Sequence, residues 1–99
     1  MSESVSTRNV KVANRQGIHA RAATLIAHTV RRFDAKVIIV KDRERVEGTN
    51  VLHMLSLGAE CGAELQLEAT GRQAQEALDA LADLIANQLH LEEDHPAGT

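Results

Sequence analysis

The apolar residues of this chain change their spacing several times, and these changes constrain the fold more than any other feature. They alternate with polar residues along a half-buried strand, and they recur every three or four residues along one face of a helix. Strands are expected at residues 5–13, 35–41, 45–48 and 63–70, and helices at residues 20–32, 49–58 and 74–89. This order, β-α-β-β-α-β-α, predicts an α+β fold with helices on one side of an antiparallel or mixed sheet. Spacing alone leaves the strand order open.

The core must be almost entirely aliphatic. Hydrophobic residues make up 43% of the 99 residues, but Phe33 is the only aromatic one. Alanine-rich helices must therefore pack closely against their neighbours. A chain of this length forms one domain, expected over residues 1–99 with an ordered core at about residues 5–89. The polar residues 91–99 are expected to form a flexible tail.

Composition also excludes several classes of function. A net charge of −3 and the lack of aromatic side chains for base stacking argue against a nucleic-acid partner. No apolar run approaches the ~18 residues that a membrane span needs, so no membrane association is expected. Cys61 is the only cysteine, which excludes an internal disulfide and favours a cytoplasmic location. Its side chain is expected at a helix end or in the core.

One histidine lies where a loop runs into a helix, in "NRQGIHARAATLIAHTV", residues 14–30. The first N–H groups of a helix have no internal partner and carry a partial positive charge. They disfavour the imidazolium form of His19, which leaves a nucleophilic lone pair, and they can bind an anion carried by the ring. The phosphate-facing backbone groups are expected at Ala20, Ala22 and Ala23. The guanidinium of Arg21 matches phosphate oxygens.

The alternative interpretation of His19 is a plain surface cap of the helix. The histidines and the single cysteine show no metal-binding spacing, so no metal site is expected. The segment "GIHARAA" lacks the lysine pattern of a P-loop and the pattern G-x-G-x-x-G, so no nucleotide cofactor is expected. A phosphoryl donor would therefore be another protein.

The same segment, "GIHARAA", resembles the phosphorylation-site segment of the histidine-containing phosphocarrier proteins (HPr) of the bacterial phosphotransferase system. "LSLGAECGAEL" and "EATG" also match, and "FDAKVII" resembles the nitrogen-related branch. The resemblance implies an open-faced β-sandwich, a four-stranded antiparallel sheet with three helices on one face. It further implies that Nδ1 of His19 takes a phosphoryl group from the phosphoenolpyruvate-dependent Enzyme I and passes it to an EIIA-type protein, assisted by Arg21.

Two residues depart from the family pattern. Ala22 stands where the family usually has proline, and alanine is expected to preserve the helix with a looser start. Asn50 stands where many members carry a serine that an HPr kinase modifies, and its amide cannot be phosphorylated. Kinase control is therefore not expected, unless Thr49 substitutes; Ser56 is the other nearby hydroxyl.

The short helix at residues 49–58 contains more apolar residues than two turns can bury: Val51, Leu52, Met54, Leu55 and Leu57. An exposed remainder would mark a partner site, although all five could pack inward. The resemblance implies a docking patch of Val51, Leu52 and Leu55, with Ala20 and Thr24. A basic zone facing an acidic partner is a further possibility: Arg31, Arg32, Lys36, Lys41, Arg43 and Arg45.

The resulting functional hypothesis is a monomeric phosphocarrier, a relay intermediate rather than an independent catalyst. Its expected partners are Enzyme I and EIIA-type proteins, with an HPr kinase or a transcriptional regulator as further candidates. The alternative is a regulatory binding module of the same fold that carries no phosphate and acts by docking. A purely structural domain would explain the fold but not His19.

Overall fold

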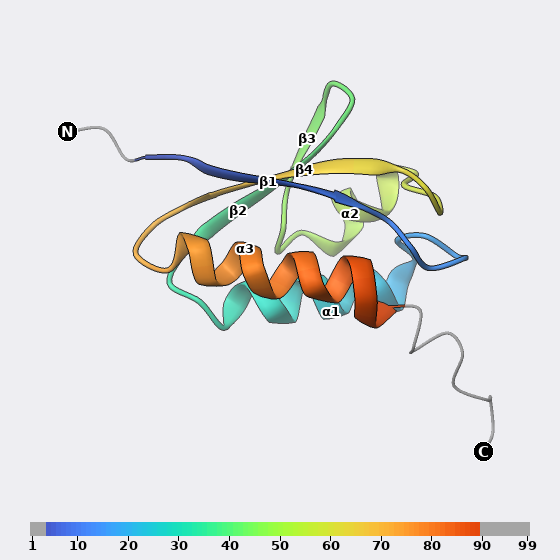
Figure 1. Ribbon diagram of the computed structural model, residues 1–99. Helices are drawn as coiled ribbons and strands as arrows, with labels where there is room; N and C mark the ends of the chain where they lie inside the picture. Colours follow the sequence, from blue (N-terminus) through green and yellow to red (C-terminus); the bar gives the residue numbers. More distant parts are fainter. Residues whose placement is uncertain (1–3, 90–99) are drawn as a thin grey trace, which may run out of the picture.

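A computed structural model describes residues 4–89 of the chain. An antiparallel four-stranded sheet is covered on one face by three helices (Figure 1). The strands are β1 (Ser6–Lys11), β2 (Lys36–Lys41), β3 (Glu44–Glu47) and β4 (Glu64–Thr70), and the helices are α1 (Ala20–Arg31), α2 (Val51–Ser56) and α3 (Ala74–Asp83). The predicted α+β, open-faced arrangement is confirmed. The expected tail, residues 91–99, lies outside the described residues.

The strand order, which the sequence left open, is β1-β4-β2-β3, with every pair antiparallel. The first and last strands of the chain are therefore neighbours, paired from Ser6 with Ala69 to Lys11 with Glu64. The register aligns Ile39 of β2 with buried residues on both neighbouring strands, Val46 and Leu67. One face of the sheet is therefore apolar and packs against the helices.

The core between sheet and helices is aliphatic, as the composition requires. Its largest fully buried hydrophobic side chains come from α1, β2, α2, β4, α3 and the segment that follows α3, and from the residue after β1: Ile26, Ile39, Met54, Leu65, Leu67, Leu78, Leu81, Ile85, Leu89 and Val12. Ala22, Ala23 and Ala27 of α1 are also buried. These small side chains allow α1 to lie close to its neighbours, and α1 and α3 run side by side beneath the sheet (Figure 1).

The long helix expected at residues 74–89 is interrupted. After α3 the chain forms a single π-helical turn, η1 (Leu84–Gln88). The carboxylate of Asp83 accepts hydrogen bonds from the side-chain amides of Asn87, at 3.0 Å, and of Gln88. Gln88 lies five residues after Asp83, a spacing that matches the wider π-helical turn. The apolar face continues through η1, since Leu84 and Ile85 are buried.

Cys61 is exposed, so the expectation of a helix-end or core position was wrong. It lies in the turn before β4, where Gly62 N–H donates to the Val12 carbonyl at 2.8 Å. The Sγ of Cys61 lies 3.7 Å from the carbonyl oxygen of Ala13. Both the backbone of the turn and the Cys61 thiol therefore contact the chain just after β1.

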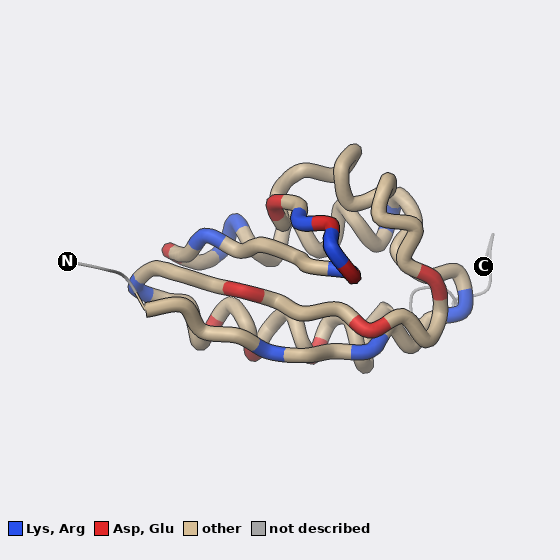
Figure 2. The backbone as a smooth tube through the Cα atoms, turned by 90° about the horizontal axis from the view of Figure 1, so that it is seen from above, with Lys and Arg blue, Asp and Glu red and all other residues tan. Residues whose placement is uncertain are grey.

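The uncovered face of the sheet is mostly polar, with the half-buried Ile38 and Val40 of β2 in its middle, and basic and acidic residues lie on neighbouring strands (Figure 2). The guanidinium of Arg45 on β3 donates two hydrogen bonds, of 2.5 and 3.2 Å, to the carboxylate of Glu68 on β4, across the intervening β2. The hydrogen bonds from Arg45, and secondarily its charge, lower the pKa of Glu68, while partial burial opposes this shift. This pair links a short edge strand to the centre of the sheet.

The Glu68 carboxylate therefore contributes stability that is present above its unfolded-state pKa and is lost as pH falls through its lowered folded-state pKa. We expect Glu68→Gln to reduce the melting temperature slightly at pH 7, and the difference from the wild type to shrink below about pH 4.5. Glu64→Gln, on the same strand, removes the same charge without breaking the pair. Equal pH dependence of thermal unfolding in the two variants would contradict a stabilising role for the pair.

Candidate functional site

The loop before α1 is held against the turn that leads into β4. Gly17 has a φ of 68°, and a Cβ atom added to it would lie 2.2 Å from the carbonyl oxygen of Ala59. The N–H of Ile18 donates to that same oxygen at 2.9 Å, and the Ile18 side chain is buried. Only glycine combines this backbone angle with this close approach. The buried Ile18 therefore anchors the loop in the core, and the next side chain, His19, is half-buried.

His19 is the N-cap residue of α1 by position, with an extended backbone (φ −93°, ψ −175°). Its carbonyl accepts the first hydrogen bond of the helix, from the N–H of Ala23 at 2.8 Å, and its side chain makes no capping hydrogen bond. The half-buried ring is therefore not used as the plain helix cap of the alternative interpretation. Capping does not occupy its nitrogens.

The first turn of α1 supplies part of the expected anion site. The backbone N–H groups of residues 20–22 precede the first hydrogen bond of the helix. The N–H of Ala23 was also expected to face the phosphate. This expectation was wrong, because that N–H donates to the His19 carbonyl inside the helix. Ala20 and Arg21 are exposed, whereas Ala22 is buried. The helix begins at Ala20 without the family proline, as expected.

Apolar side chains of α2 remain at the surface, as its composition predicted. Met54 and Leu57 are buried, and Val51 is half-buried. Leu52 and Leu55 are exposed, with 75% and 36% of their surface accessible to solvent. The inward packing of all five residues is therefore excluded. We name Val51, Leu52 and Leu55 the α2 patch; it lies on a helix that packs beside α1.

The two α1 residues expected beside the α2 patch, Ala20 and Thr24, are both exposed. The Thr24 hydroxyl donates to the Ala20 carbonyl at 2.9 Å, which holds it on its own helix. Asn50 caps α2, since its Oδ1 accepts the N–H of His53 at 3.1 Å. Its amide thus has a structural role at the position of the family serine.

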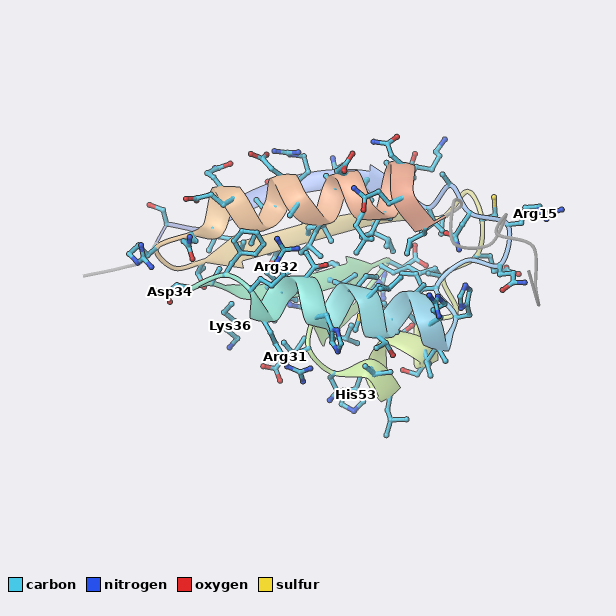
Figure 3. All side chains as sticks on the ribbon, turned by 90° about the horizontal axis from the view of Figure 1, so that it is seen from below. Arg15, Arg31, Arg32, Asp34, Lys36 and His53 are labelled. Carbon is cyan, nitrogen blue, oxygen red and sulfur yellow. The ribbon has the colours of Figure 1, made fainter. Side chains whose placement is uncertain are left out.

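The six basic residues come from two parts of the fold. Arg31, Arg32 and Lys36 lie at the end of α1 and the start of β2 (Figure 3), and the guanidinium of Arg31 donates to the Thr49 carbonyl at 3.5 Å. The cations of the β2–β3 hairpin are accompanied by acidic residues: Lys41 lies 3.4 Å from Asp42, and Arg45 pairs with Glu68. These acidic neighbours offset part of the positive charge, and a basic zone facing a partner stays a prediction.

Sequence reasoning missed Asn14, the residue that closes the loop before Gly17. Asn14 is fully buried, and its side-chain Nδ2 donates to the Gly17 carbonyl at 2.6 Å. An asparagine three residues before a glycine is a common turn pattern, which was the available signal. Its burial depends on the tertiary fold and could not be anticipated.

Residues 4–89 contain no group of three or more His, Cys, Asp or Glu placed to hold a metal ion. No helix in the same range has the length and apolar character needed to cross a membrane.

The sheet, covered on one face by helices, defines an open-faced β-sandwich, and a half-buried histidine stands at the N-terminus of its first helix. The sequence profile of the PTS HPr component phosphorylation site matches residues 6–87. The chain is 38% identical to the phosphocarrier protein HPr of Treponema pallidum, over 86% of this chain and 97% of that protein. It is 37% identical to the phosphocarrier protein NPr of Shewanella violacea, over 79% of this chain and 86% of that protein.

A solved structure confirms the fold. HPr of Bacillus anthracis superposes with a TM-score of 0.79 at 30% identity, covering 83% of this chain and 98% of that one. The chain therefore belongs to the HPr family of phosphocarrier proteins of the phosphotransferase system.

The contact of Gly17 with Ala59 gives a stability prediction. Gly17→Ala forces a side chain into the left-handed region and against a backbone oxygen, and we expect a loss of about 3 kcal/mol or more in the free energy of unfolding. Gly58→Ala is the matched control, because its φ of 63° is similar but no atom lies within 4 Å of the added Cβ. Denaturant unfolding should show the smaller, strain-only loss of about 1–2 kcal/mol there; equal losses would contradict the close packing.

Proposed function

We propose that this chain accepts a phosphoryl group on His19 from Enzyme I and passes it to an EIIA-type protein. The observation that carries the proposal is the position of His19. Its ring makes no capping bond, and it stands at the head of α1 where the N–H groups of residues 20–22 precede the helical hydrogen bonds. Membership of a phosphocarrier family supports the same chemistry.

In the proposed step, a lone pair of the neutral imidazole attacks the phosphorus, by the family's example from Nδ1. A nitrogen–phosphorus bond forms as the bond from phosphorus to the donor breaks, and the donor keeps that electron pair. The partial positive charge of the helix N-terminus stabilises the phosphoryl dianion by about 0.3–1 kcal/mol at an exposed site. The guanidinium of Arg21 adds hydrogen-bond donors for its oxygens.

A stabilisation of this size suits a carrier. The phosphoryl group must be held until a partner arrives and then be released, so tight binding would oppose the second transfer. Partners supply the remaining catalytic groups, and we propose that they dock on the α2 patch together with Ala20 and Thr24. Transient contacts of this kind bury less than ~1,200 Å².

We also propose that Asn50 removes control by an HPr kinase. Its side chain is an amide, which has no hydroxyl to phosphorylate and instead caps α2. The neighbouring Thr49 is half-buried, and its carbonyl accepts a hydrogen bond from Arg31. The competing function, a docking module that carries no phosphate, draws on the same Asn50 and on Ala22. Because α1 starts normally despite Ala22, that substitution does not indicate a lost site.

We expect phosphorus NMR to show a phosphohistidine signal after the protein is incubated with Enzyme I and phosphoenolpyruvate. His19→Ala should abolish the signal, because it removes the nucleophile. His28→Ala, which removes an exposed histidine from the same helix, should retain it. A wild-type protein that remains unphosphorylated would favour the docking module instead.

The α2 patch yields a second prediction for transfer. Leu52→Glu or Leu55→Glu places a charge in the docking surface, and we expect the rate of phosphoryl transfer from Enzyme I to fall about tenfold or more, a loss of about 1.4 kcal/mol. Circular dichroism should show an unchanged fold, since both side chains are exposed. Val5→Glu makes the same change at an exposed valine before β1 and should leave transfer unaffected. Unchanged rates in both leucine variants would exclude the patch.

A further inference from the structure

Asn14 is the one polar residue of the described range, residues 4–89, that is buried to the level of the core. Burying a side-chain amide is unfavourable unless it is hydrogen-bonded. Its burial therefore indicates that the conformation of the loop depends on this side chain, whereas a turn at the surface could form without a buried amide.

The hydrogen bonds of Asn14 lead directly to His19. Its Nδ2 donates to the Gly17 carbonyl at 2.6 Å, and the Gly17 N–H donates to the Asn14 carbonyl at 3.1 Å. A carbonyl oxygen only accepts, so the amide nitrogen must be the group that faces it. The N–H of His19 donates to the same Gly17 oxygen at 3.1 Å. One carbonyl group thus joins Asn14 to His19.

This junction fixes the direction in which the chain enters α1. The Gly17–Ile18 peptide unit is planar, and on the side opposite the Gly17 carbonyl its N–H donates to the Ala59 carbonyl at 2.9 Å. The amide of Asn14 holds the same peptide unit from its carbonyl side. The backbone of His19, and with it the root of the imidazole, is then held relative to the N–H groups of residues 20–22.

We propose that Asn14 is a positioning residue for phosphoryl transfer at His19. The inference rests on the proposed function of His19 and adds to it a residue that need not touch the phosphoryl group. Asn14 acts through the Gly17 carbonyl and the His19 N–H. Small errors in the placement of a reacting group can lower a rate by about 10²-fold, so the loss of this hydrogen bond is expected to affect transfer more than folding.

The test compares Asn14→Ala with Asn14→Ser in the full chain. The two side chains are similar in size, but a serine hydroxyl can still donate to a nearby backbone carbonyl, more weakly than an amide. Val37→Ala is the control for lost stability, because Val37 is buried beside Gly48 and Val30, toward the other end of α1. Each variant is measured at a temperature at which it is fully folded.

Two quantities are measured: the rate of phosphoryl transfer from Enzyme I, and the hydrogen-exchange rate of the His19 N–H by NMR. We expect Asn14→Ala to slow transfer about tenfold or more and to accelerate exchange at His19. Asn14→Ser should recover part of both, and Val37→Ala should change neither. If Asn14→Ala does not fold, Asn14→Ser against the wild type makes the same comparison.

The proposal is overturned if transfer in the Asn14 variants is no slower than in Val37→Ala, whatever the exchange rates. It is also overturned if transfer slows while exchange at His19 is unchanged, because Asn14 would then act by another route. Failure of the wild type to be phosphorylated would instead disprove the proposed function, and this inference with it. The wild-type measurement therefore separates the two failures.

Discussion

The geometry around His19 depends on the contact between two backbone segments that are far apart in the sequence. Gly17 lies so close to Ala59 that no side chain fits between them, and Ile18 donates a hydrogen bond to the same carbonyl. A further hydrogen bond joins the same two segments, because the Val12 N–H donates to the Ala63 carbonyl at 2.9 Å. The loop is therefore fixed by the turn before β4, and its conformation is a property of the whole fold.

The remaining surface divides into regions of different chemistry. The uncovered face of the sheet is mostly polar, and Arg45 pairs with Glu68 on it across β2. The helical side has the α2 patch, in which Leu52 is the most exposed large apolar side chain of the described residues. Exposed apolar patches of this kind tend to mark sites of protein contact.

The sequence predicted local features well and long-range features poorly. The bounds of α1 were expected within one residue because apolar residues recur at helical spacing up to Val30 and basic residues follow. His19 was found from the junction of loop and helix, and its family from "GIHARAA". The strand order was not accessible, since pairing of β1 with β4 leaves no local trace. The π turn η1 and the burial of Asn14 both follow from contacts made only in the folded chain.

The pairing of β1 with β4 has a consequence for the order of events during synthesis. The strand that leads to His19 is made first, but its only neighbour in the sheet is the last strand to leave the ribosome. The turn that holds Gly17 immediately precedes that strand. The loop before α1 therefore gains its contact with this turn only after most of the protein has emerged, so the geometry around His19 forms late in folding.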